Sequence, residues 1–226
     1  MTTTTPTRRT LPLALLALLA PLASACGDDG VSVPQPVPVP KSSLLRFSSP
    51  RAAQSRLLVI GLPGAVEGVG QVEATDIPSG ARTVVPSSAQ GSFGLLAATS
   101  NVSDLEIRFI NDEGRSEPAP IVQAGRFGGP VLGDPLSNGT VTRANGNTVL
   151  VSNDGGAGNP LLFSATPDSI AHLSNPANGA LTSGTTDAIG RLSLSIEAQS
   201  GDILQLVLAD PQNPTETSNY LSLPVP

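Results

Sequence analysis

Apolar and polar side chains alternate over short stretches of this chain, and beyond residue 43 no window of eleven or more residues carries the apolar stripe of an amphipathic helix. The clearest stretch has Leu105, Ile107 and Phe109 on one side and Glu106 and Arg108 on the other. A period of two residues places the three apolar side chains on one face of a β-strand. Because clusters of Gly, Pro, Asn and Ser separate such stretches, the sequence predicts an all-β protein, either a sandwich or a barrel.

The chain repeats itself at an offset of 99 residues. This shift brings Leu105, Ile107 and Phe109 onto Leu204, Leu206 and Leu208. It also relates turn glycines and further inward residues in pairs: Gly80 and Gly179, Gly91 and Gly190, Phe93 and Leu192, Leu95 and Leu194. A single offset that preserves turns and core positions together indicates a duplicated domain.

Upstream of these pairs the offset changes. Val59 and Ile60 correspond best to Leu150 and Val151, which implies an insertion of about eight residues in the second copy, around residues 159–167. Seven strands are expected in the first copy, near 43–48, 55–62, 70–76, 80–86, 91–98, 102–111 and 117–122. In the second they are expected near 139–143, 147–152, 161–164, 169–174, 179–184, 190–197 and 201–209, with a last strand near 218–224. Asn145-Gly146 predicts a tight hairpin, since a type I′ turn needs positive φ at both central residues.

Parts of the first copy resemble a known group of domains. They are Val59–Glu67, Gly91-Ser92-Phe93 and Leu105–Gly114, which are similar to the bacterial immunoglobulin-like repeats of envelope proteins. The carboxypeptidase-regulatory-like sandwiches share the hairpin of glycine, small residue and aromatic residue, so both resemblances stand. They cover residues 44–122 and, with fewer matches, 140–226. The resemblance implies two tandem seven-stranded immunoglobulin-like β-sandwiches with an adhesive or spacer role, and it carries no catalytic residue.

The amino-terminal residues predict export. Arg8 and Arg9 precede an apolar run from Leu11 to Leu22, and residues 23–25 (Ala-Ser-Ala) supply a small-residue cleavage site, so residues 1–25 are predicted to be a signal peptide. Residues 22–26 resemble the lipobox of bacterial lipoproteins, with Ala23 where that motif usually has leucine. The resemblance implies lipid attachment at Cys26, the only cysteine, whereas ordinary signal-peptidase cleavage would leave a bare thiol there.

The domain plan follows from these segments. Residues 26–43 contain alternating prolines and are predicted to be a disordered linker. A first sandwich spans 44–122, a Gly- and Pro-rich linker spans 123–138, and a second sandwich spans 139–226. Gly27 stands where an aspartate would favour inner-membrane retention in enterobacteria, so the outer membrane is the expected location, on its periplasmic or surface face.

Charge and composition exclude several function classes. Without residues 1–25, which include Arg8 and Arg9, the chain has 10 basic and 18 acidic side chains, a net charge of −8. Such an acidic chain offers no electrostatic footprint for nucleic acid. Tryptophan is absent and Tyr220 is the only tyrosine, whereas carbohydrate sites commonly use aromatic platforms. No disulfide can form within the chain, so packed cores must stabilise it.

Two polar features were candidates for chemistry. His172, the only histidine, corresponds to Glu73 by the 99-residue shift, and we expect it to be a surface imidazole because no partners for a triad or a zinc site are evident. Asp112 and Glu113, with Glu117, are the one acidic cluster that could coordinate calcium, although a solvated turn is the interpretation we favour. No catalytic residue and no cofactor are predicted.

The sequence therefore predicts a non-enzymatic, lipid-anchored envelope protein. Its partners would be the membrane, through lipidated Cys26, and other envelope proteins, which its sandwiches would contact or hold at a distance. The alternative is a small-ligand or glycan-binding lipoprotein of an uptake system, whose site would lie in the enlarged loop at 159–167, which contains Phe163.

Overall fold

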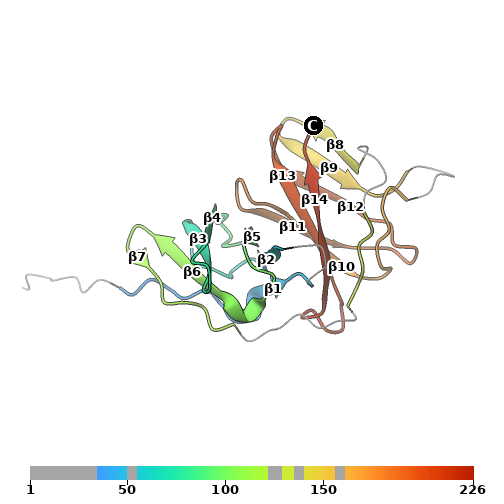
Figure 1. Cartoon of the computed structure of the whole chain (residues 1–226). Helices are drawn as coiled ribbons and strands as arrows, with labels where there is room; N and C mark the ends of the chain where they lie inside the picture. Colours follow the sequence, from blue (N-terminus) through green and yellow to red (C-terminus); the bar gives the residue numbers. More distant parts are fainter. Residues whose placement is uncertain (1–34, 50–54, 122–128, 135–139, 156–160) are drawn as a thin grey trace, which may run out of the picture. The chain divides into compact units, whose positions relative to one another are not determined.

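The computed structural model describes residues 35–49, 55–121, 129–134, 140–155 and 161–226. These residues form an all-β structure whose only helical elements are the short 3₁₀ turns Ser42–Leu44 and Val102–Asp104 (Figure 1). Contacts divide the chain between Pro34 and Gln35, and residues 35–226 form one compact unit. That unit contains two β-sandwiches, as the two-residue period predicts.

Seven antiparallel strands form the first sandwich. The strands are β1 (Leu45–Phe47), β2 (Leu57–Gly61), β3 (Gln71–Asp76), β4 (Arg82–Pro86), β5 (Phe93–Ala97), β6 (Leu105–Asn111) and β7 (Gly114–Arg115). One sheet has the order β1-β2-β5 and the other β4-β3-β6-β7. The chain therefore crosses between the sheets after β2, after β4 and after β5, and the two sheets bury their apolar faces against each other.

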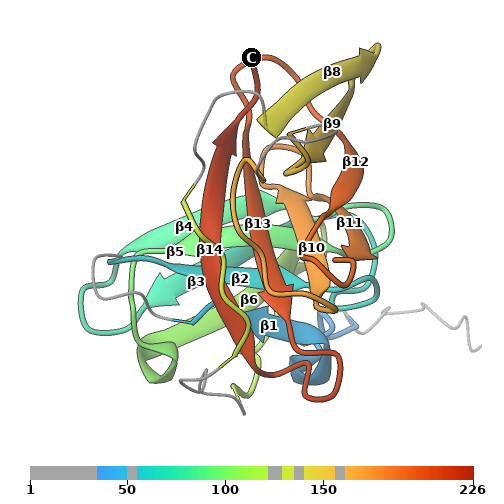
Figure 2. The same ribbon diagram turned by 90° about the vertical axis from the view of Figure 1, so that its right-hand side faces the viewer.

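The second sandwich repeats this topology. Its strands are β8 (Val141–Asn145), β9 (Thr148–Ser152), β10 (Ile170–Asn175), β11 (Ala180–Thr185), β12 (Ser193–Glu197), β13 (Ile203–Ala209) and β14 (Thr217–Pro224). The sheet orders are β12-β9-β8 and β11-β10-β13-β14, and Figure 2 shows the strands of each sheet side by side. Strand for strand, β8 to β14 take the places of β1 to β7.

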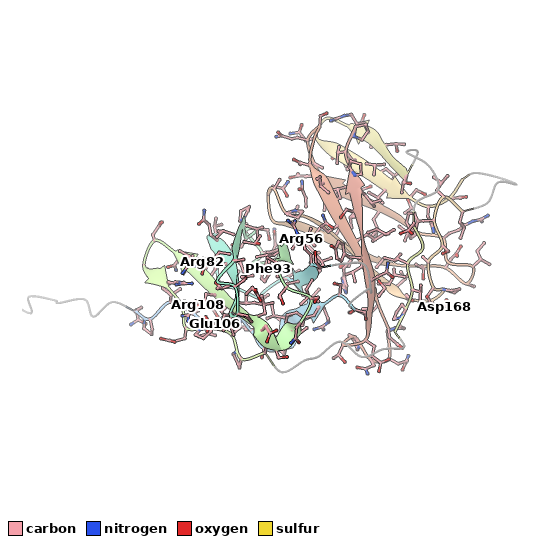
Figure 3. All side chains as sticks on the ribbon, viewed as in Figure 1. Arg56, Arg82, Phe93, Glu106, Arg108 and Asp168 are labelled. Carbon is pink, nitrogen blue, oxygen red and sulfur yellow. The ribbon has the colours of Figure 1, made fainter. Side chains whose placement is uncertain are left out.

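Each sandwich has its own apolar core. On β6, Leu105, Ile107 and Phe109 are at most 4% exposed, and Phe93 on β5 fills the same core (Figure 3). On β13, the equivalent Leu204, Leu206 and Leu208 are fully buried in the second core. The alternation read from the sequence therefore identifies the inward faces of both copies correctly.

The strand pairing corrects one part of the predicted alignment between the copies. Val59 on β2 pairs with Leu95 on β5, and Val151 on β9 pairs with Leu194 on β12. Val59 therefore corresponds to Val151 at an offset of 92, rather than to Leu150. The difference from the offset of 99 means that seven residues are inserted before the next equivalent turn. A slip of one residue would have placed every inward side chain of β9 on the outer face.

Gly91 and Gly190 show why the duplication preserves its turn glycines. Both have positive φ, 72° and 81° respectively. A Cβ at Gly91 would collide with the carbonyl oxygen of Val66, and a Cβ at Gly190 would collide with that of Ala165. Val66 and Ala165 are themselves related by the 99-residue shift, so both the turn and the backbone that closes over it are repeated.

Two predicted strands are not formed as expected. Of the predicted strand 117–122, the described residues 117–121 form no strand; β7 lies earlier and spans two residues. Ser116 and Ala119 still donate backbone hydrogen bonds to β6, but Pro118 and Pro120 have no N–H to continue a ladder. In place of the strand predicted at 161–164, Ala165 forms an isolated bridge with Leu132.

Both predicted linkers contribute residues to a core. Val37 is 9% exposed and packs into the first core, and the nearby Lys41 donates its backbone N–H to the Ala65 carbonyl oxygen at 2.8 Å. Leu132, from the stretch between the copies, is 1% exposed in the second core. The packed parts of the chain therefore include residues that the Gly and Pro content assigned to linkers.

Candidate functional site

The predicted lipid site lies outside the described residues, as do the signal peptide at 1–25 and the linker up to residue 34. The acidic residues proposed for calcium are described. Asp112 and Glu113 form the exposed turn between β6 and β7, where the Glu113 N–H donates to the Asn111 side chain at 3.0 Å, and Glu117 is exposed beyond β7. Across the described residues, no three His, Cys, Asp or Glu side chains are grouped so that they could hold a metal ion. The calcium hypothesis gains no geometric support.

His172 is not the surface imidazole that the sequence predicts. Its neighbours on β10, Ala171 and Leu173, point into the second core, so His172 does point outward from the sandwich as expected. It is nevertheless only 6% exposed, because the first sandwich covers this outer face. The sequence pattern identifies which face the residue is on, but not what covers that face.

A third apolar cluster joins the two sandwiches. Leu58 and Ile60 from the outer face of β2 are buried against Val207 of β13 and Tyr220 of β14. Partly buried Leu62, Leu96 and Leu181 pack around them. We call these seven residues the contact cluster. Each buried aliphatic side chain of this size stabilises a contact by about 1.5–3 kcal/mol relative to exposure.

Hydrogen bonds fix the position of the contact cluster at its edges. Just beyond β1, the Ser49 N–H donates to the Ser218 carbonyl oxygen at 2.8 Å. The Thr217 hydroxyl donates to the Phe47 carbonyl oxygen. At another edge, the Ser92 hydroxyl donates to the Gly179 carbonyl oxygen at 3.2 Å. Because these bonds use the backbone of both sandwiches, they define one orientation.

The backbones also approach each other closely at glycine positions. A Cβ at Gly94 on β5 would collide with the Ser174 side chain on β10, and one at Gly179 would lie 2.7 Å from the backbone at Pro86 and Ser87. The absence of side chains at these positions lets the two surfaces meet.

His172 is held within this contact beside a cation. Its Nδ1 lies 2.8 Å from the Ser183 hydroxyl oxygen. Burial, with a further contribution from the positive charge of Arg46, lowers the pKa of His172 from 6.5 to about 4. Burial also lowers the pKa of Arg46, whose Nε is buried without a hydrogen-bond partner among the described residues.

Ser183 and His172 are residue types that can act as a nucleophile and a general base, but this His172 lacks the pKa and the accessibility that a general base needs. A general base works best with a pKa near the working pH, and a pKa of about 4 leaves His172 a weak proton acceptor at neutral pH. Its burial beneath the first sandwich also keeps substrate from the ring.

The equivalent outer face of the first sandwich carries charge instead. On the sheet β4-β3-β6-β7, Glu73 occupies the position of His172 and forms ion pairs with Arg115 and with Arg82, the latter at 3.9 Å. Arg108 pairs with Glu106 at 3.2 Å. Arg82, Glu106 and Arg108 are labelled on this sheet in Figure 3. The duplicated faces therefore have different chemistry.

A surface pocket of about 340 Å³ lies at one end of the second sandwich. It is lined by Ser152, Asp154, Thr185, Asp187, Arg191, Leu192 and Ser193. Its charged groups already have partners, since Arg191 lies 3.7 Å from Asp154 and its backbone N–H donates to the Asp187 carboxylate at 2.8 Å. None of these lining residues belongs to the enlarged loop at 159–167, and none is aromatic.

Among the residues that the structure describes, no helix has the length and apolar character needed to cross a membrane. No protein-family model matches the chain, and a search of curated proteins finds no match.

Several solved structures of bacterial adhesion proteins are similar to this chain at low scores. The BSP domain of a biofilm-associated protein has a TM-score of 0.27 and 10% identity, over 80% of this chain and 29% of that one. A bacterial ice-binding adhesin has a TM-score of 0.24 and 13% identity, over 80% and 62%. A Ca²⁺-stabilised adhesin of an Antarctic bacterium has a TM-score of 0.27 and 17% identity, over 83% and 46%. This chain thus spans less than two thirds of each, and TM-scores of this size carry no argument about fold or function.

Proposed function

We propose that this chain is a non-enzymatic, lipid-anchored protein of the bacterial cell envelope, in which two immunoglobulin-like β-sandwiches act as one rigid module for protein contact, adhesion or spacing. Lipid on Cys26 would tether the module to a membrane, with the outer membrane as the expected location. Its partners would be other envelope proteins.

The contact between the sandwiches carries this proposal. Tandem domains joined only by a linker move relative to each other by default, whereas a buried apolar contact with defined hydrogen bonds suppresses that motion. Here Leu58 and Ile60 are fully buried against the second sandwich, and the backbones of Ser49 and Ser218 are hydrogen-bonded across the contact. A module of fixed geometry suits the presentation of a surface at a set distance from a membrane.

Strand β8 offers an accessible edge for a partner. It is an edge strand that pairs only with β9 in the described structure, and Thr142–Asn145 are exposed. An exposed edge can accept a further strand through its unpaired backbone groups.

The anchor and the contact role need separate experiments. Growth with a labelled fatty acid should label the wild-type protein but not Cys26→Ser, which should leave the membrane fraction; labelling of both proteins would refute the anchor. A photo-crosslinking residue at Thr142 on β8 should capture one discrete partner in intact cells, whereas the same residue at the exposed Val69 should not. Equal yields at the two positions would leave only the spacer role.

The alternative is a small-ligand or glycan-binding lipoprotein, favoured by the pocket at the end of the second sandwich. Its volume of about 340 Å³ lies at the lower end of the range typical of small-molecule sites. Thermal-shift measurements with simple sugars and with calcium test this role, because a ligand that binds the folded state must raise Tm. No shift at millimolar concentration would reject it.

A further inference from the structure

The only histidine of the chain is buried in the contact between the two sandwiches. His172 projects from β10 toward the outer face of the sheet β1-β2-β5, on which Arg46 pairs with Ile60. At the edge of the contact cluster, directly beside Val207, therefore lies a group whose charge can change between pH 7 and pH 4.

The groups around His172 cannot neutralise an imidazolium. Arg46 on β1 acts on it as a cation, and Ser183 on β11 supplies a hydroxyl. The other strands of its sheet supply Val207, directly opposite on β13, and Tyr220 on β14, which senses the positive charge of Arg56. No carboxylate is among the groups that affect the pKa of His172. A proton on the ring would therefore place a buried positive charge near the partly buried guanidinium of Arg46.

We propose that the contact between the sandwiches is an acid-sensitive latch, in which protonation of His172 releases β10, β13 and β14 from the outer face of β1, β2 and β5. In the closed form His172 is neutral, because burial and the positive charge of Arg46 both disfavour protonation of the ring. The open form exposes the ring to water, where it takes up a proton at its ordinary pKa. Acid therefore shifts the balance toward the open form, while the two cores, which contain no histidine, stay folded.

The size of the shift follows from proton linkage. A pKa of about 4 in the closed form and 6.5 in the open form changes the ratio of open to closed molecules by about 100-fold between neutral pH and pH 4. This latch is a property of the packed sandwiches, and it holds whether or not the chain carries lipid.

Tyr220 makes the latch measurable, because it is the only tyrosine, tryptophan is absent, and it lies in the contact cluster at 8% exposure. The experiment is acrylamide quenching of tyrosine fluorescence in the full chain from pH 7.5 to 3.5, with far-UV circular dichroism in parallel. We expect quenching to rise below about pH 6 while the β spectrum is retained. Constant quenching, or loss of the β spectrum over the same range, would overturn the proposal.

Two variants and a control separate His172 from other acids. His172→Asn keeps a polar atom near Ser183 but cannot gain charge, so its quenching should not rise with acid. Arg46→Met retains His172 without the neighbouring cation, so its rise should be smaller than in wild type. Glu73→Gln, at the equivalent position of the first sandwich, should behave as wild type. A rise in His172→Asn equal to that in wild type, or one in Arg46→Met larger than in wild type, would refute the latch.

Discussion

Valine at Gly94 should force the sandwiches apart without disturbing either core. Gly94 lies on the outer face of β5, paired with Ile60 on β2, and a Cβ there would collide with both the Oγ and the Cβ of Ser174. Ser174 is fully buried on the central strand β10, so neither backbone can move aside easily. Overpacking of this kind costs about 1–3 kcal/mol. The contact should therefore weaken by roughly 5- to 150-fold.

The duplication provides a matched control for this variant. Ser193 is the position equivalent to Gly94 in the second sandwich, and it is exposed on β12. Gly94→Val should increase acrylamide quenching of Tyr220 at pH 7.5 and lower Tm, whereas Ser193→Val should do neither. Adding Ser174→Gly should restore room for the valine, with a coupling free energy of about 1–3 kcal/mol in a double-mutant cycle. Zero coupling, or equal effects of the two valines, would refute the reasoning that Gly94 is a point of contact.

Three further predictions concern stability. The pKa of His172 is about 4 in the folded state and 6.5 in the unfolded state, so neutral His172 contributes fully to the free energy of unfolding above pH 6.5. This contribution is lost as pH falls toward 4, by up to about 3 kcal/mol. Urea unfolding of His172→Asn should therefore be less sensitive to pH in this window than that of wild type. Gly91→Ala should destabilise by about 2–4 kcal/mol, because it combines positive φ with a collision, whereas Gly80→Ala, with φ of 69° and open space, should cost only about 1–2 kcal/mol in the same assay. Asn153→Leu should cost about 2–4 kcal/mol of unfolding free energy, because this fully buried amide bonds the Phe163 and Gly190 carbonyl oxygens and the Leu192 N–H; a cost under 1 kcal/mol would contradict it.

The sequence was sufficient to predict what depends on short-range periodicity. Alternation in Leu105–Phe109 and its copy identified the inward faces, and paired glycines such as Gly91 and Gly190 identified the repeated turns. These signals are local, because a strand's faces and a turn's φ values are properties of a few consecutive residues. They fail where position depends on partners far along the chain, as the one-residue error at Val59 shows.

Burial by a distant surface was the main feature that sequence reasoning missed. Val37 and Leu132 are single apolar residues in stretches rich in Gly and Pro, so no period marks their contribution to the cores. His172 follows the correct period, but the period does not report that a second domain covers its face. One signal was present: Leu57–Ile60 is an uninterrupted apolar run in which every residue is fully buried, and such a run is typical of a strand covered on both sides.

Comparison of the two copies also explains why further copies of the chain need not stack on the two sandwiches through the same kind of contact. The contact joins two different faces, the three-stranded sheet of one copy and the four-stranded sheet of the next, and a contact of this kind propagates if the same faces are free and complementary. The free faces have lost that complementarity.

On the four-stranded sheet of the first sandwich, Arg108 and Arg82 stand where Val207 and Leu181 stand in the second. On the three-stranded sheet of the second sandwich, Ser152 and Ser195 replace Ile60 and Leu96. Stacking a further copy would bury the ion-paired arginines against hydroxyl groups rather than form an apolar cluster. Desolvating charge without compensation is unfavourable. The two arginines and two serines therefore protect the free faces from self-association, while the apolar residues at the equivalent positions hold the sandwiches together.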